Sequence, residues 1–99
     1  MSGAKRTTPE EAQRIGDEIG VDWVVFDLEQ FRAGMDVELE HGSRDPQTNV
    51  TNDDPIVTGK IALAHMKEFP DYYERLARME ADAERDWAEM RVEGKQHDL

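Results

Sequence analysis

The sequence predicts a small all-α protein: a four-helix bundle with a long ordered loop between its second and third helices. Apolar residues recur every three or four positions along most of the 99-residue chain. Residues that favour helix starts precede these stretches, and glycine or proline follows them. Residues 21–26 have the composition of a strand, but no second strand is available to satisfy their backbone hydrogen bonds.

The first helix is predicted to begin at T-P-E-E, residues 8–11. Here the threonine can cap, the proline suits the first helical position, and the second glutamate completes a capping box. Ala12, Ile15 and Ile19 then share one face of the helix. Gly20 is the predicted terminator, because glycine readily adopts the left-handed conformation that ends many helices.

Residues 21–26 (V-D-W-V-V-F) are predicted to form an extended connector whose two aromatic side chains fill the core. Asp27 then begins the second helix, since Asp27 and Gln30 have the spacing of a capping box. Apolar residues follow on one face of this helix. His41 and Gly42 mark its predicted end, with glycine again in the stop position.

The long loop is predicted over residues 42–54, where glycine, proline, asparagine, aspartate and threonine dominate. The cluster of Asn49, Asn52, Asp53 and Asp54 could bind Ca²⁺ through its oxygens. The residue spacing of a calcium-binding loop is absent, however. Helix capping and turns closed by Asn or Asp side chains are therefore the preferred explanation for the cluster.

Asp54 and Pro55 predict the start of the third helix, whose apolar face carries His65 in its middle. Pro70 interrupts this pattern. The fourth helix is predicted over residues 70–93, a length of roughly 36 Å at 1.5 Å per residue. It is longer than the helices it would pack against, so its last two turns are expected to project beyond the core.

The chain has 23 acidic and 12 basic residues, which gives a formal net charge of −11. Such a surface repels phosphate backbones and anionic lipids, so neither nucleic acid nor a membrane is an expected partner. The absence of cysteine excludes disulfides and thiolate chemistry. No apolar run is long enough for a signal peptide or a membrane span, and a cytoplasmic location is expected. One helical domain is predicted over residues 8–93, between flexible tails at 1–7 and 94–99.

Four blocks of the sequence resemble a small family of uncharacterised bacterial and phage proteins, known only as a domain of unknown function. The blocks are E-L-E-H-G (38–42), T-N-V-T-N-D-D-P (48–55), G-K-I-A-L-A-H (59–65) and P-D-Y-Y (70–73). The resemblance covers residues 21–79. It implies a shared fold and no particular activity, cofactor or catalytic residue.

Two Glu/His pairs are the strongest candidates for a chemical site. Glu38 and His41 on the second helix, and His65 and Glu68 on the third, are each three residues apart and so lie on one side of their helix. Together they would offer two imidazoles and two carboxylates, a ligand set suited to Zn, Mn or Fe. The alternative is that His65 is a hydrogen-bonded core histidine paired with Glu38.

No glycine-rich phosphate loop and no nucleophile elbow occurs in the sequence, so hydrolytic chemistry is unsupported. The leading expectation is a non-enzymatic accessory protein without a cofactor, which binds a protein partner or a second copy of itself. Its candidate interaction surface consists of Tyr72, Tyr73, Trp87 and Met90. The rival expectation is a protein that binds a divalent metal ion through the two Glu/His pairs.

Overall fold

The structure, a computed structural model, describes residues 6–92. Its four α-helices and one short 3₁₀ turn are α1 (Pro9–Ile19), α2 (Leu28–Glu38), η1 (Leu39–His41), α3 (Pro55–Glu68) and α4 (Tyr72–Val92). No strand occurs among the described residues, which confirms the all-α prediction. The remainder of the predicted tails, at 1–5 and 94–99, lies outside the described part of the chain, as does the predicted helix end at residue 93.

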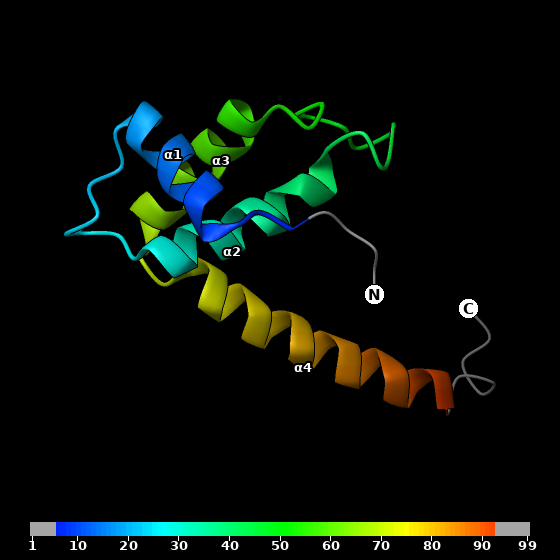
Figure 1. Ribbon diagram of the computed structural model, residues 1–99. Coiled ribbons are helices and arrows are strands. Elements are labelled where there is room, and N and C mark those ends of the chain that lie inside the picture. Colours follow the sequence, from blue (N-terminus) through cyan, green and yellow to red (C-terminus); the bar gives the residue numbers. More distant parts are fainter. Residues whose placement is uncertain (1–5, 93–99) are drawn as a thin grey trace.

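The core lies where α1, α2 and α3 meet, and Figure 1 shows these three helices grouped together. Ile15 from α1, Phe31 from α2 and Met66 from α3 are among its completely buried side chains. Each such side chain contributes about 1.5–3 kcal/mol through the hydrophobic effect. Gly59 lets α3 approach α1 closely, because a β-carbon there would lie 2.7 Å from Cγ2 of Ile15. Packing around this glycine leaves no room for a larger residue.

The three predicted helix starts are confirmed. The Thr8 hydroxyl accepts a hydrogen bond from the amide of Glu11, and the Glu11 carboxylate accepts one from the amide of Thr8, both at 3.0 Å. Asp27 accepts a bond from the amide of Gln30, and Asp54 accepts bonds from two amides in the first turn of α3. Caps of this kind are worth about 1 kcal/mol each, so local sequence largely determines where these helices begin.

Residues 21–26 form a turn, and the predicted extended connector is wrong. The amides at positions 25 and 26 donate to the carbonyl of Asp22, at 3.0 and 2.9 Å, and the Asp22 carboxylate accepts the amide of Val24. Aspartate commonly closes turns in this way, and here that tendency outweighs the strand-like composition around it. Trp23 and Phe26 are nevertheless partly buried against the core, as expected.

The loop over residues 42–54 is ordered by its own hydrogen bonds. The amides of Val50 and Thr51 both donate to the carbonyl of His41, and the amide of Asp54 donates to the carbonyl of Thr51. Thr51 is only 2% exposed, so it is the side chain through which the loop packs against the rest of the protein. These contacts hold the loop beside the ends of α2 and α3 that it connects.

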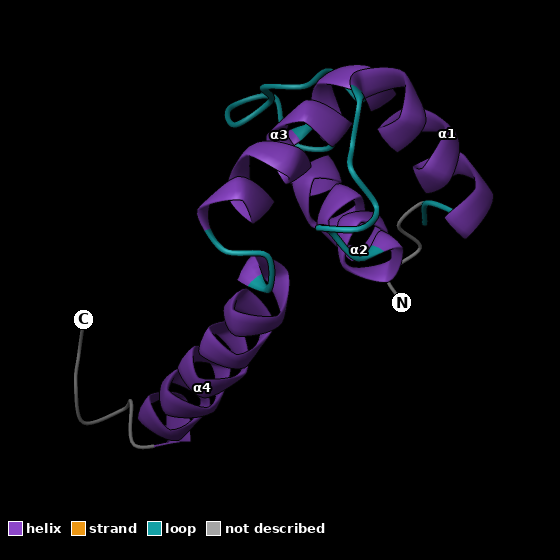
Figure 2. Ribbon diagram, turned by 90° about the vertical axis from the view of Figure 1, so that its left-hand side faces the viewer, coloured by secondary structure: helices purple, strands orange, loops and turns teal. Residues whose placement is uncertain are grey.

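Helix α4 leaves the core soon after it begins, and Figures 1 and 2 show it as an arm that points away from the other three helices. It starts at Tyr72, where the backbone amide donates to the carbonyl of Phe69. Tyr73 is buried, and Tyr72 and Leu76 pack partly against the core. From residue 77 to residue 91 no side chain is buried. The predicted projection is therefore confirmed and is longer than two turns.

Candidate functional site

The face of α4 that points away from the core carries exposed apolar side chains. A stripe of apolar side chains, called here the α4 stripe, follows one face of this helix and consists of Leu76, Met79, Ala83, Trp87 and Met90. Successive members are three or four residues apart, so they lie in line on the helix. Met79 is 56% exposed and Trp87 is 54% exposed. Two large apolar side chains thus face solvent where no other described element covers them.

The base of α4 is fixed by a cluster of three polar side chains from three helices. The Tyr73 hydroxyl donates a 2.6 Å hydrogen bond to Oε2 of Glu38. Nδ1 of His65 lies 3.0 Å from the same oxygen and 2.9 Å from the Tyr73 hydroxyl. Glu38 is only 4% exposed, so its carboxylate depends on these partners for its hydrogen bonds. The predicted contact between His65 and Glu38 is confirmed.

The pKa of Tyr73 is strongly raised. Burial raises the pKa of its hydroxyl far above the usual range, and the hydrogen bond to Glu38 and that carboxylate's charge raise it further. The hydroxyl therefore remains protonated and acts as a permanent donor to Glu38. Its ring also lies directly over Gly34, where a β-carbon would lie 2.4 Å from the ring atom Cε2. Tyr73 belongs to the interior, not to the exposed interaction surface on which the sequence suggested it.

Tyr72 packs on the outer side of the polar cluster at the base of α4. Its ring stacks on the imidazole of His65, with ring centres 4.4 Å apart and planes within 3° of parallel. The ring of Phe69, just before α4, is also nearly parallel to the Tyr72 ring, with ring centres 6.4 Å apart. Tyr72 is half-buried, so it contributes an aromatic edge beside the start of the α4 stripe. The arrangement gives the arm a rigid attachment to α2 and α3.

The four residues predicted as metal ligands are not brought together. Among residues 6–92, no group of three or more His, Asp or Glu side chains could hold a metal ion. Glu38 and His65 are in contact, but Glu38 points into the core while His41 is exposed in η1. Glu68 is exposed at the end of α3. The spacing within each pair suggested a metal site. In each pair, however, one side chain is at least partly buried and the other is exposed, so the four do not converge on one ion.

The polar cluster of the loop forms a helix cap and turns closed by side chains, as expected from the sequence. The Asn49 side chain accepts the amide of Asn52 at 2.7 Å, and Asp53 binds the amide and hydroxyl of Ser43 across the loop. Asn52 and Asp53 have positive φ angles of 52° and 63°, a conformation that Asn and Asp tolerate better than most residues. Asp54 caps α3, so each of the four residues stabilises either the loop or the helix start that follows it.

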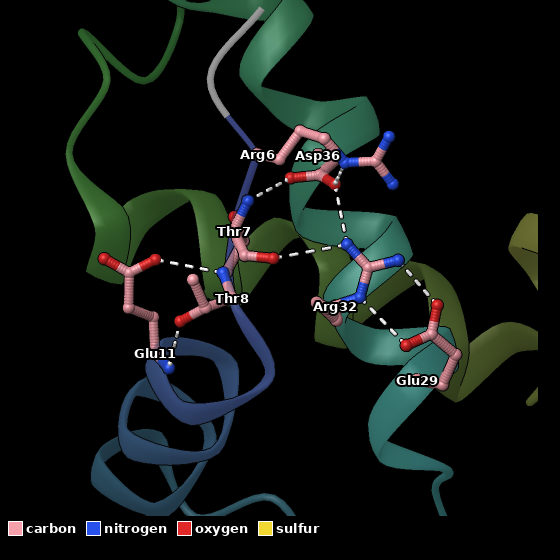
Figure 3. Close-up of polar contacts among 7 residues, drawn as sticks. All are labelled: Arg6, Thr7, Thr8, Glu11, Glu29, Arg32 and Asp36. Carbon is pink, nitrogen blue, oxygen red and sulfur yellow. Dashed lines mark hydrogen bonds and ion pairs between the residues drawn. The ribbon is translucent and has the colours of Figure 1, made fainter.

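A groove of about 870 Å³ lies between the amino-terminal segment, α2 and the loop, and sequence reasoning missed it. Arg32 lines it and binds Glu29, Asp36 and the carbonyl of Thr7, as Figure 3 shows. The amide of Thr7 donates to Asp36 at 2.7 Å, so residues 6 and 7 lie against α2 although they were expected in the tail. The hydrogen bond to Glu29 and the charges of Glu29 and Asp36 outweigh burial and raise the Arg32 pKa.

The groove has no clear preference for a ligand. Its lining includes four arginines and four acidic residues, so the charges balance. Arg32 already uses four of its five N–H donors on partners within the chain. The contacts of Thr7 with Arg32 and Asp36 span 25 and 29 positions in sequence, so local sequence patterns do not reveal them.

Within the described part of the chain, no helix combines the length and the hydrophobicity needed to cross a membrane. No curated protein and no solved structure matches the sequence significantly. A family model does match, over residues 12–82, which is most of the chain and begins earlier than the blocks at 21–79 suggested. The match includes the cluster of Glu38, His65 and Tyr73 and ends within α4. The chain belongs to the family described as "Protein of unknown function (DUF5661)".

Proposed function

We propose that this chain is a non-enzymatic cytoplasmic interaction protein, which presents the α4 stripe to a protein partner. The observation that carries the proposal is the exposure of Met79 and Trp87 on a helix that has left the core. Single exposed apolar residues are common on proteins and mean little. An aligned stripe on a projecting helix is different, because helical spacing is what a second helix or a groove requires.

The energetics of α4 support the same proposal. Its outer part, residues 77–91, has no buried side chain, and isolated helices shorter than about 12–15 residues are marginal in water. Ion pairs such as Arg78 with Glu74 and Arg85 with Asp82 each add only about 0.2–0.5 kcal/mol. A partner that covered Met79 and Trp87 would contribute about 1 kcal/mol for each half-exposed side chain. Binding would therefore stabilise the arm as well as hold the partner.

The cluster at the base of α4 is suited to holding this helix in a fixed direction. Tyr73 joins the helix to Glu38 on α2, and His65 on α3 contacts both residues. Because these bonds are buried or half-buried, they resist competition from water better than surface bonds do. These hydrogen bonds fix the direction of the arm, and a fixed direction lowers the conformational entropy lost when a partner binds.

A photocrosslinking experiment tests the proposal. Trp87 is replaced by benzoylphenylalanine in one variant, and Arg85, which lies about 160° away around the helix, is replaced in a control variant. After irradiation in the cells that naturally make the protein, position 87 is expected to give a discrete adduct of higher mass. Position 85 is expected to give none. No adduct from position 87, or equal adducts from both positions, would show that the α4 stripe is not an interaction surface.

A further inference from the structure

We infer that the partner of the α4 stripe is an amphipathic helix whose apolar face is bordered by lysine or arginine. The inference rests on the proposed function and adds the chemistry of the partner to it. It follows from where the charges of α4 lie around the helix, and from what those charges would meet on each possible partner.

Acidic side chains border the α4 stripe on both sides. With Ala83 as the centre of the stripe and 3.6 residues per turn, Glu80 lies about 60° to one side and Glu84 about 100° to the same side. Asp86 lies about 60° to the other side. None of these three carboxylates forms an ion pair with another described residue. They are exposed charges beside an exposed apolar face.

The arginines of α4 are placed differently. Arg78 and Arg85 lie about 140–160° from the centre of the stripe and bind Glu74 and Asp82 of the same helix. Arg75 and Arg91 both lie about 80° from the centre of the stripe, Arg75 beside the core where it binds Asp71 and Arg91 in the last turn of the described helix. Three of these four arginines are thus paired with acidic residues of the chain, while Glu80, Glu84 and Asp86 remain available to a partner.

A second copy of the chain fits the spacing of the stripe but not its charges. The intervals within the stripe read the same in both directions from Ala83, so an antiparallel copy would set Leu76 against the other Met90. The same arrangement would bring Glu80 of one chain close to Glu84 of the other. Asp82 and Asp86 would meet on the opposite border in the same way. Like charges at such positions weaken helix pairing and steer it toward other partners.

A parallel pair of copies conflicts with the fold itself. Leu76, at the start of the stripe, already packs against its own core. In a parallel pair the same part of the second helix would need that space, together with the core attached to it. A separate helix with basic borders avoids both difficulties, because it brings opposite charges to Glu80, Glu84 and Asp86. From Leu76 to Met90 the stripe extends about 21 Å, so the partner helix needs roughly four turns.

A displayed library of 18-residue helical peptides provides the test. Apolar positions along one face vary among Leu, Ile, Met and Ala, and the bordering positions vary among Lys, Gln and Glu. The full chain is the bait. Selection is expected to enrich lysine and deplete glutamate at the borders, and the enriched peptides should bind more weakly as salt is raised. Replacement of Trp87 by serine is expected to abolish their binding.

Two matched triple variants separate the border charges from the net charge of the protein. The first carries Glu80→Gln, Glu84→Gln and Asp86→Asn. The second carries three neutralisations at exposed positions outside α4, at Glu18, Glu40 and Glu68, each to Gln. Each variant removes three negative charges and changes the net charge from −11 to −8. The first is expected to bind a selected peptide roughly tenfold more weakly, and the second nearly as well as the wild type.

Several results would overturn the inference. These are enrichment of neutral or acidic borders, recovery of no binding peptide, equal weakening in both triple variants, or a photocrosslinked adduct of twice the mass of the chain. In each case a discrete adduct from position 87 would still support the proposed function. Loss of that adduct would remove the proposed function and the inference together.

Discussion

The Tyr73 hydroxyl links α4 to α2 and α3, so removing this one oxygen tests the contribution of the polar cluster. Tyr73→Phe leaves the ring in place and removes a donor from the buried Glu38 carboxylate. The expected loss is about 1–3 kcal/mol in the free energy of unfolding, since a buried acceptor loses a partner. Urea denaturation followed by circular dichroism measures it. Tyr72→Phe is the control and should change stability by less than about 0.5 kcal/mol.

The raised pKa of Tyr73 also predicts how stability depends on pH. Burial, and after it the bond to Glu38, keep this hydroxyl protonated in the folded protein. In the unfolded chain it loses its proton near the ordinary tyrosine pKa of about 10. Above that pH the unfolded state binds fewer protons than the folded state, so the free energy of unfolding falls as pH rises.

The measurement compares wild type with Tyr73→Phe from about pH 8 to about pH 11. The stability advantage of the wild type should be constant at the lower end and shrink above about pH 10. Up to the pH of unfolding, the absorbance change at 295 nm should be the same in the wild type and in Tyr73→Phe, because Tyr73 does not ionise in the folded protein. A larger change in the wild type before it unfolds would mean that Tyr73 lacks the buried hydrogen bond to Glu38.

At the scale of the helices, the contact between α2 and α4 depends on Gly34. In an exposed helix a change from glycine to alanine stabilises by about 0.5–1 kcal/mol. At Gly34 the new β-carbon would lie 2.4 Å from the Tyr73 ring, so we expect destabilisation by about 1–3 kcal/mol instead. Thermal or urea unfolding of Gly34→Ala gives the sign directly. In a Tyr73→Ala background the same change should become neutral or stabilising, and persistence of the penalty there would contradict the contact.

The loop between α2 and α3 depends on Asp53, which binds Ser43 ten residues away. We expect Asp53→Ala to speed hydrogen exchange at the Ser43 amide, because the carboxylate that accepts this amide at 3.0 Å is gone. Asp45→Ala is the matched control, since the Asp45 carboxylate accepts the amide of Gln47, two residues away in the same loop. It should leave exchange at Ser43 unchanged, and equal effects would mean that Asp53 does not organise the loop.

The elements were predictable from sequence where their causes are local. Thr8, Asp27 and Asp54 cap helices through amides two or three residues away, so a short window of sequence contains both partners. The cluster at the base of α4 joins residues 27 and 35 positions apart. Helical periodicity placed His65 on an apolar face and suggested Glu38 as its partner, but it did not orient Tyr73. That orientation depends on how three helices pack.

At the scale of the whole molecule, sequence predicted four helices and an overhang, but not where the core ends. Periodicity continues along α4 from Tyr72 to Met90, and nothing in it distinguishes apolar residues that meet the core from those that do not. The limit is set by the lengths and crossing of α2 and α3. Those helices provide partners for the first two turns of α4 and for no later ones. Three helices therefore form the core, and the fourth extends from it.

The projecting arm gives the molecule a size that can be measured in solution. The radius of gyration is 16.0 Å, whereas a compact domain of 99 residues would have about 13 Å. We expect small-angle X-ray scattering to give a value near the larger figure, because residues 77–91 of α4 bury no side chain against the other described helices. Met79→Ser with Trp87→Ser should leave this value unchanged, since neither side chain is buried.

Two outcomes of the scattering measurement would count against an isolated arm. A radius near 13 Å would mean that α4 lies against the core and that its stripe is already covered. A radius that grows with protein concentration in the wild type, but not in the double serine variant, would mean that the stripe pairs with a second copy despite the acidic residues beside it. A concentration-independent radius near 16 Å leaves the stripe open, and acidic repulsion between copies explains why it stays open until a basic partner arrives.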